Sequence, residues 1–204
     1  MYDPAMDITD RVRIRRVDVL SDDWYVLKKT VLDWRRASGQ WQTVSRETYD
    51  RGNGAVVLPY NRTQQTIVLT RQFRYPAYAN GYRKLLIEAA AGLLDDASPE
   101  DRIRAEVEEE TGYRLDNVRK IFEAFMSPGS VTEKLHFFVG EYEPHMRVSS
   151  GGGLEREGED IEVLELPMGE ALAMVEDGRI VDGKTILLLQ YAALHLFSAE
   201  GKNR

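Results

Sequence analysis

The chain has 204 residues, a formal net charge of −7 and no cysteine. Its length suits one large domain, or one domain with a small addition. The lack of cysteine excludes disulfides, thiolate metal sites and a cysteine nucleophile. The acidic balance, with a pI near 5.1, argues against a nucleic-acid partner. We expect a cytoplasmic protein without a membrane partner, because the apolar runs are short and the start lacks a secretory signal pattern.

The first third of the chain has the composition of β-strands. Apolar and charged residues alternate at its start, and later runs are rich in β-formers on either side of a polar turn. The predicted strands cover residues 12–19, 24–34, 41–49, 55–58 and 67–69. Because the early strands are more polar than the later ones, we expect a separate antiparallel β unit over residues 1–50 and a main domain over residues 51–204.

The rest of the chain alternates between helices and strands. Ser98 is a suitable N-cap, Pro99 suits the first helical position and Gly112 suits a C-cap, so a helix is predicted between them. Residues 149–160 are rich in Gly and acidic residues, which is typical of a mobile loop. Further strands are predicted at residues 118–125, 135–141 and 161–166, and further helices at 170–176 and 184–197. The order indicates an α/β fold with a mixed sheet.

Carboxylates crowd the last turns of the predicted central helix. Glu106, Glu109 and Glu110 fall within an arc of roughly 100° about the helix axis. Two carboxylates about 6 Å apart repel by roughly 3 kcal/mol at an effective dielectric constant near 20. Hard oxygen ligands suit Mg²⁺ or Mn²⁺, and such an ion would offset the repulsion. By itself the helix is more typical of a solvated acidic face, because Arg102 and Arg104 lie one turn upstream.

The surroundings of this helix resemble the Nudix box, G-x5-E-x7-R-E-U-x-E-E-x-G-U, in which U is apolar. The matching residues are Gly92, Glu106, Val107, Glu109, Glu110, Gly112 and Tyr113. Ala105 stands where the box has Arg, and Gly92 lies one residue closer to the helix than usual. The role of the box Arg, which orients a glutamate, is therefore empty or taken by Arg102 or Arg104.

The resemblance extends over most of the chain. The strings that carry it are R-E-T-Y-D-R-G-N-G from Arg46, R-Q-F-R from Arg71, E-A-A-A-G-L-L from Glu88, M-S-P-G from Met126, E-D-I-E-V-L-E-L-P from Glu159 and D-G-K-T from Asp182. Their order is similar to that in Nudix enzymes that split nucleoside-diphosphate sugars, with the GDP-mannose hydrolase branch nearest. The resemblance implies a Nudix α/β/α sandwich with a mixed central sheet, preceded by the N-terminal antiparallel β unit.

The resemblance also implies a metal site. In such enzymes Mg²⁺, or Mn²⁺, activates a water that attacks one phosphorus of the diphosphate. The implied ligands are the Ala91 carbonyl, Glu106, Glu110 and, directly or through water, Glu109. Glu110 and Glu159 are the implied catalytic residues. Glu159 acts as general base or further ligand, with Glu155 and Glu157 as competitors in the same loop.

The substrate-binding residues that the resemblance implies are Trp24, Arg46, Glu47, Arg74, Glu133 and Lys184. Arg74 is the better candidate for phosphate, because a guanidinium matches phosphate oxygens in pairs. Family members form homodimers in which the N-terminal strands cross to the partner. The expected products are a nucleoside monophosphate and a sugar phosphate. The alternatives are an ADP-ribose pyrophosphatase and a nucleotide-sugar sensor without catalysis.

Another stretch of the chain matches a phosphate-binding motif in sequence but not in its predicted structural context. Residues 178–185 read G-R-I-V-D-G-K-T, which matches the P-loop pattern. A P-loop needs a buried strand before it, so that backbone N–H groups wrap the phosphate. A helix is predicted at residues 170–176 instead, and we expect no P-loop nucleoside triphosphatase.

Overall fold

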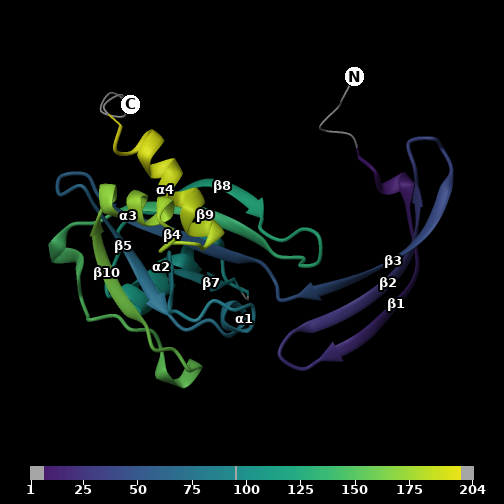
Figure 1. Cartoon of the computed structure of the whole chain (residues 1–204), viewed down its shortest axis with the longest axis horizontal. Coiled ribbons are helices and arrows are strands. Elements are labelled where there is room, and N and C mark those ends of the chain that lie inside the picture. The colour runs from purple at the N-terminus through teal and green to yellow at the C-terminus, as the bar shows by residue number, and fades with distance from the viewer. Residues whose placement is uncertain (1–6, 95, 199–204) are drawn as a thin grey trace. The chain divides into compact units, whose positions relative to one another are not determined.

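The computed structural model describes residues 7–94 and 96–198. The described residues form two compact units (Figure 1). The first contains the described residues up to Gly52 together with Ser127–Glu133. The second runs from Asn53 to Met126 and continues from Lys134.

The first unit is an antiparallel sheet with strand order β1-β2-β3. A short 3-10 turn, η1 (Thr9–Arg11), precedes β1 (Val12–Asp22), β2 (Val26–Arg35) and β3 (Trp41–Asp50). The segment Ser127–Glu133 joins this unit through two backbone hydrogen bonds. The Tyr49 N–H donates to the Ser130 carbonyl at 2.8 Å, and the Thr132 N–H donates to the Tyr49 carbonyl at 3.1 Å. The sequence placed this segment in the main domain, because its link to β3 leaves no local pattern.

The second unit is built on a mixed sheet with strand order β10-β5-β4-β9-β8. Only β4 and β9 run parallel among its described strand pairs. The main strands are β4 (Gly54–Asn61), β5 (Thr66–Gln72), β8 (Arg119–Phe125), β9 (Lys134–Glu141) and β10 (Glu162–Pro167). Two short strands add to the sheet, β6 (Leu86–Glu88) on β5 and β7 (Ala91–Leu93) on β4. The helical segments are α1 (Tyr75–Ala79), α2 (Pro99–Thr111), η2 (Pro144–Met146), η3 (Glu155–Glu157), α3 (Met168–Glu176) and α4 (Gly183–His195).

Helices cover both faces of this sheet, which confirms the predicted α/β/α class. Along β4, Ala55 and Val57 pack in the cluster that contains Ile103 and Val107 of α2. The alternate residue Val56 packs in the other cluster, with α3 and α4. The period of two in a strand sends neighbouring side chains to opposite faces. Figure 1 shows α3 and α4 together on one side of the sheet.

The structure contains short elements that the sequence pattern did not indicate. These are α1, β6 and β7, of which the two strands have three residues each. Three residues are too few to show a periodicity. Helix α3 also begins at Met168, two residues before the predicted start.

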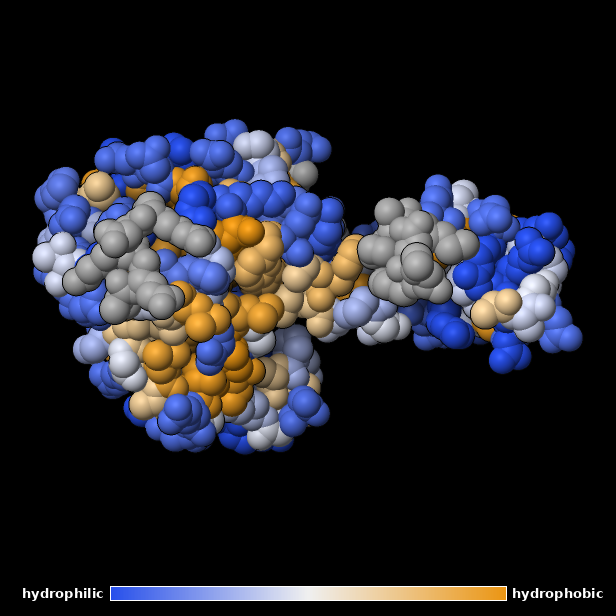
Figure 2. All heavy atoms as spheres, turned by 90° about the horizontal axis from the view of Figure 1, so that it is seen from above, coloured by the Kyte–Doolittle hydropathy of each residue, from blue (hydrophilic) through white to orange (hydrophobic). Residues whose placement is uncertain are grey.

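The C-terminal helix α4 presents both a buried and an exposed apolar side. Leu188 and Leu189 are fully buried in the core, whereas Leu187 and Leu194 are 42% and 66% exposed. Figure 2 shows apolar side chains gathered on this face of the larger unit. No helix in the described part of the chain is long and apolar enough to cross a membrane.

Candidate active site

Helix α2 places two carboxylates on its buried side. The Ser98 hydroxyl accepts a hydrogen bond from the Asp101 N–H at 3.1 Å, and Gly112 ends the helix in a left-handed conformation. These caps fix the register of the helix, as expected from the sequence. Glu106 and Glu110, one turn apart, are 6% and 2% exposed. Such burial of acidic residues is rare and indicates a purpose other than solvation.

Glu110 is a buried carboxylate whose ionised form is unfavourable in this site. Its Oε2 atom is buried and has no hydrogen-bond partner among the described residues. Burial, followed by the charges of Glu106, Glu88 and Glu159, raises the pKa of Glu110 well above its usual value, and Arg74 acts in the opposite direction. An ionised Glu110 therefore has no ion-pair partner among the described side chains, and a bound cation would stabilise it.

Glu106 has such a cation beside it. Arg102, one turn earlier on α2, forms an ion pair with Glu106 through Nη2, and its Nε donates to the Leu93 carbonyl at 2.9 Å. Arg104 instead pairs with Glu100 at 2.7 Å. Arg102 is thus the arginine that contacts a box glutamate, although Ala105 stands at the position of the box Arg.

The backbone before the helix lies directly against Glu106. Strand β7 pairs Ala91 and Gly92 with β4, and a Cβ built at Gly92 would overlap the Glu106 carboxylate. Only glycine leaves room for this close approach. The geometry places the main chain at Ala91, the implied carbonyl ligand, next to a candidate carboxylate ligand.

The loop after β9 is anchored to the end of α2. The Gly152 N–H donates to the Glu110 carbonyl at 2.9 Å, and the Gly153 N–H donates to the Glu109 carbonyl at 3.1 Å. A side chain at Gly151 would collide with the same helix end. The glycines therefore pack the loop against α2 in this structure, and the mobility expected for residues 149–160 stays a prediction.

This anchored loop carries Glu159 towards Glu110. The Glu159 Oε2 accepts a hydrogen bond from the Leu154 N–H at 2.9 Å, and its charge contributes to the raised pKa of Glu110. Its competitor Glu155 is exposed. The side chain of Glu157 lies outside the described part of the structure. Glu159 is therefore the loop glutamate for which the structure gives an interaction with α2.

Two cations face the same site from other elements. Arg74, at the start of α1, donates through Nε to Glu88 Oε1 at 2.6 Å. Lys184, in the first turn of α4, donates to Glu88 Oε2 at 2.6 Å and contacts Asp182 at 3.0 Å. Burial acts to lower the pKa of Lys184, but Glu88 and Asp182 outweigh it and raise that pKa. Lys184 is therefore charged at neutral pH.

The remaining candidates lie in the first unit. Trp24 is 80% exposed in the turn between β1 and β2, and Arg46 and Glu47 are exposed on β3. Glu133 forms an ion pair with Arg51 at 3.4 Å. The structure thus brings together the metal-site candidates with Arg74 and Lys184 in the second unit. It places the other four candidates in a different unit.

Sequence reasoning missed two polar groups of this region, Glu88 and Gln72, and left a third as an alternative. Glu88 is 2% exposed and holds both cations. Arg102 was only one of two alternatives for the missing arginine. Gln72, 4% exposed on β5, has an Nε2 atom without a partner among the described residues. Glu88 had a recognisable signal, because a single charge at the end of an apolar run must be paired when it is buried.

A metal ion fits the chemistry of this site, although its ligands do not form a ready-made cage. Within the described residues, no three acidic or histidine side chains are gathered in a metal-binding arrangement. The buried, unpartnered Glu110 Oε2 and the mutual repulsion of the carboxylates are the features that a hard divalent cation would satisfy. Glu106 forms an ion pair with Arg102, and Glu109 is half-buried at the same helix end.

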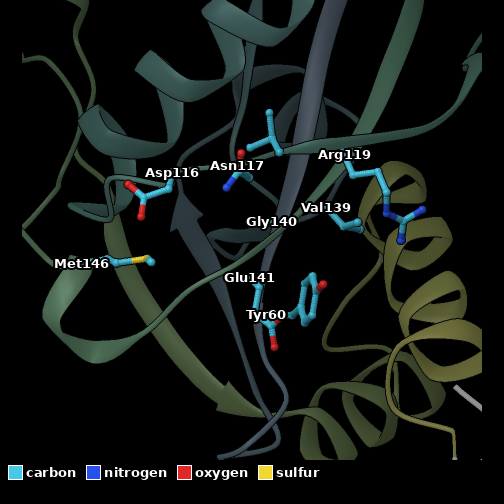
Figure 3. Close-up of a pocket in the computed structure, with 9 residues that line it drawn as sticks. Tyr60, Asp116, Asn117, Arg119, Val139, Gly140, Glu141 and Met146 are labelled. Atoms are coloured by element: carbon cyan, nitrogen blue, oxygen red, sulfur yellow. The ribbon is translucent and has the colours of Figure 1, made fainter. Parts of the chain in front are cut away.

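A cavity beside the sheet lies away from these carboxylates. Figure 3 shows a cavity of about 320 Å³ lined by Tyr60, Asp116, Arg119 and Glu141, among others. Tyr60 belongs to the end of β4, whereas β7 pairs with its beginning. No candidate residue among those that the structure describes lines this cavity. The candidate site is therefore indicated by its buried charges and not by this cavity.

Comparison with known proteins decides the family. The family model described as the GDP-mannose pyrophosphatase NudK N-terminal domain matches residues 11–49. A GDP-mannose pyrophosphatase of Pectobacterium atrosepticum is 57% identical over 184 residues, which cover 90% of this chain and 94% of that protein. The chain belongs to the GDP-mannose pyrophosphatase family of Nudix hydrolases. A Yersinia pestis relative of the same name is 54% identical over 88% of this chain and 90% of its own length.

A solved structure supports the fold of this Nudix hydrolase. The crystal structure of an ADP compounds hydrolase superposes with a TM-score of 0.69 and covers 90% of this chain and 93% of its own. At 16% identity this likeness concerns the fold. The comparisons confirm the resemblance drawn from the sequence, and with it an enzyme of the Nudix hydrolases, a family that generally uses a divalent metal.

Proposed function

We propose that this Nudix hydrolase cleaves the diphosphate of GDP-mannose in the presence of Mg²⁺ and releases GMP and mannose 1-phosphate. The observation that carries the proposal is the buried Glu110 carboxylate, which has an unpartnered oxygen and lies among the charges of Glu106, Glu88 and Glu159. The names of its relatives support the choice of substrate.

The proposal gives each candidate residue of the second unit a role. Glu106, Glu110 and the Ala91 carbonyl would hold Mg²⁺, with Glu109 binding directly or through water. The ion that these residues would hold would supply Lewis acidity and offset charge on the leaving phosphate. In this proposal Glu159 takes the proton of the attacking water, since the Leu154 N–H holds its carboxylate and its charge acts on Glu110.

Arg74 and Lys184 bind the diphosphate in this proposal. Both carry charge beside the carboxylates, and the side chain of Arg74 is 42% exposed, so that its guanidinium is accessible. Guanidinium and ammonium groups make short, charge-assisted hydrogen bonds to phosphate oxygens. Arg102 orients Glu106 in place of the box Arg, so the motif departure at Ala105 does not favour the sensor.

We also propose a homodimer in which the first unit completes the partner's site. Apolar side chains of β1 are about half exposed, among them Ile14, Val17 and Val19. Exposed apolar patches on a sheet indicate an interaction surface. In such a dimer Trp24, Arg46, Glu47 and Glu133 bind the base and sugar.

Mixed dimers test this arrangement. Co-expression of a Trp24→Ala chain with a Glu110→Gln chain yields mixed dimers with one intact site only if Trp24 acts on the partner. In that case the statistical mixture has about a quarter of wild-type turnover, because half of the dimers are mixed and each has one intact site. A mixture no more active than its separate components, or a monomer in sedimentation, contradicts the dimer proposal. A cytoplasmic location and the absence of a nucleic-acid partner stay predictions from the sequence.

Turnover of GDP-mannose and ADP-ribose, measured side by side with Mg²⁺, tests the proposed function. We expect faster release of GMP and mannose 1-phosphate than of the products of ADP-ribose. Faster cleavage of ADP-ribose would establish the alternative substrate, and tight binding without any product would establish a sensor. Hydrolysis in ¹⁸O-labelled water identifies the phosphorus that is attacked.

A further inference from the structure

Glu88 occupies an unusual place for a carboxylate. It is the last residue of β6, and its side chain is 3% exposed. One oxygen accepts from Arg74 Nε and the other from Lys184 Nζ, each at 2.6 Å. A single buried carboxylate thus joins the N-cap residue of α1 to a residue of α4.

The main chain around Glu88 is fixed on both sides. Its carbonyl accepts from the Thr70 hydroxyl at 3.0 Å, which ties β6 to β5. The next residue, Ala89, donates its N–H to the Thr185 hydroxyl at 2.8 Å. Asp182 caps α4 by accepting from the Thr185 N–H at 3.0 Å. Glu88 and the first turn of α4 therefore form one braced arrangement.

The arrangement leaves part of each cation for another ligand. Glu88 engages Arg74 through Nε, and the two Nη groups of Arg74 donate no hydrogen bond to the described residues. These groups form the fork that matches phosphate oxygens. Arg74 also lies within the electrostatic reach of Glu110 and Glu159. Its fork is therefore held beside the proposed metal site.

We infer that Glu88 is a positioning residue that aims Arg74 and Lys184 at the diphosphate of the substrate. The inference rests on the proposed function and adds to it a residue that itself touches neither metal nor substrate. Without Glu88, the two like charges repel each other and their long side chains sample other rotamers. A carboxylate that binds each cation with one oxygen restricts both.

Two variants of Glu88 distinguish an effect of its position from an effect of its charge. Glu88→Asp keeps the charge but withdraws the carboxylate by one methylene, so it cannot keep both contacts at 2.6 Å. Glu88→Gln removes the charge and turns an N–H₂ group towards one of the cations. If Glu88 acts only through its charge, Asp behaves as the wild type, and Gln binds anions more tightly. If it acts by position, both variants bind a diphosphate more weakly.

Isothermal titration with inorganic pyrophosphate, at fixed Mg²⁺, tests the inference without any turnover. We expect Glu88→Asp and Glu88→Gln each to weaken pyrophosphate binding about tenfold, which corresponds to roughly 1.4 kcal/mol. Glu165→Asp is the matched control, because Glu165 also accepts hydrogen bonds on both oxygens, from Tyr113 on one and from Tyr142 and Thr66 on the other. We expect this control to bind pyrophosphate within twofold of the wild type.

A double-mutant cycle separates positioning from a general loss of stability. In an Arg74→Ala background, Glu88→Asp has a smaller effect on pyrophosphate binding, because one of the two positioned groups is gone. Fully additive effects, or a Glu88→Asp chain that binds like the wild type, overturn the inference. So does a wild-type chain that does not bind pyrophosphate. Failure of the proposed function appears separately, as a wild-type chain that binds pyrophosphate but leaves GDP-mannose intact.

Discussion

Glu110→Gln should stabilise the metal-free protein while it abolishes catalysis. Carboxylates one helical turn apart, about 6 Å, repel by roughly 3 kcal/mol at an effective dielectric constant near 20. Arg102 offsets part of the charge of Glu106. We therefore expect the neutral amide to raise the free energy of unfolding by about 1–2 kcal/mol, or the melting temperature by roughly 3–6 °C for a chain of this size.

The pH dependence of stability indicates in which direction ionisation of Glu110 changes the free energy of unfolding. The pKa of Glu110 is raised in the folded chain by burial and by Glu106, Glu88 and Glu159. The folded state therefore holds this proton more tightly than the unfolded state. Stability from this group is complete below the usual pKa of 4.5 and is lost as the pH rises through the raised pKa. Glu110→Gln removes this loss, because its amide does not ionise.

Thermal unfolding in EDTA and in Mg²⁺, with turnover measured in parallel, checks this reasoning. In EDTA, Glu110→Gln melts above the wild type. Mg²⁺ raises the melting temperature of the wild type and not of the variant, because only the native wild type binds the ion. Turnover falls by about three orders of magnitude or more. Glu108→Gln is the control, since Glu108 points away from the site and pairs with Arg114 at 2.8 Å. A variant less stable than the wild type in EDTA, or one with unchanged turnover, refutes the assignment.

Three further changes test the surroundings of Glu110. Gly92→Ala pushes a methyl group into the Glu106 carboxylate, so we expect at least a tenfold loss of turnover and weaker Mg²⁺ binding by calorimetry. Arg102→Ala releases Glu106 and should lower kcat by about 10- to 100-fold, whereas Arg104→Ala should change it less than twofold. Ser98→Ala removes the N-cap of α2 and should cost about 1 kcal/mol in urea unfolding, with kcat unchanged at temperatures where the chain is folded.

Local chemistry is sufficient to predict α2 from the sequence. The start at Pro99 and the end before Gly112 depend on groups within a few residues of each boundary, and the structure has both. The spacing of Glu106 and Glu110 on this helix then places both on one face. This part of the site was accessible because helix geometry is the same wherever a helix forms.

The partners of Glu88 were not accessible in this way. Arg74 and Lys184 lie 14 and 96 positions away in the chain, and no periodicity links three residues at such distances. Similarly, the pairing of Val131 with Tyr49 joins Ser127–Glu133 to the first unit and has no local signature. A strand or loop chooses such a partner through the tertiary fold, which the sequence pattern does not display.

The site resolves an apparent conflict between an acidic protein and an anionic substrate. Glu88 neutralises much of the charge of Arg74 and Lys184, while Glu110 lacks a cation of its own. A diphosphate alone would meet net negative potential here, and a divalent cation alone would meet the nearby guanidinium and ammonium groups. Each bound ligand makes the electrostatic potential of the site more favourable for the other. The two should therefore bind with positive coupling that is equal in both directions. The presence of acidic and basic side chains within one site is the physical basis of that coupling, and Glu88 holds the two basic ones.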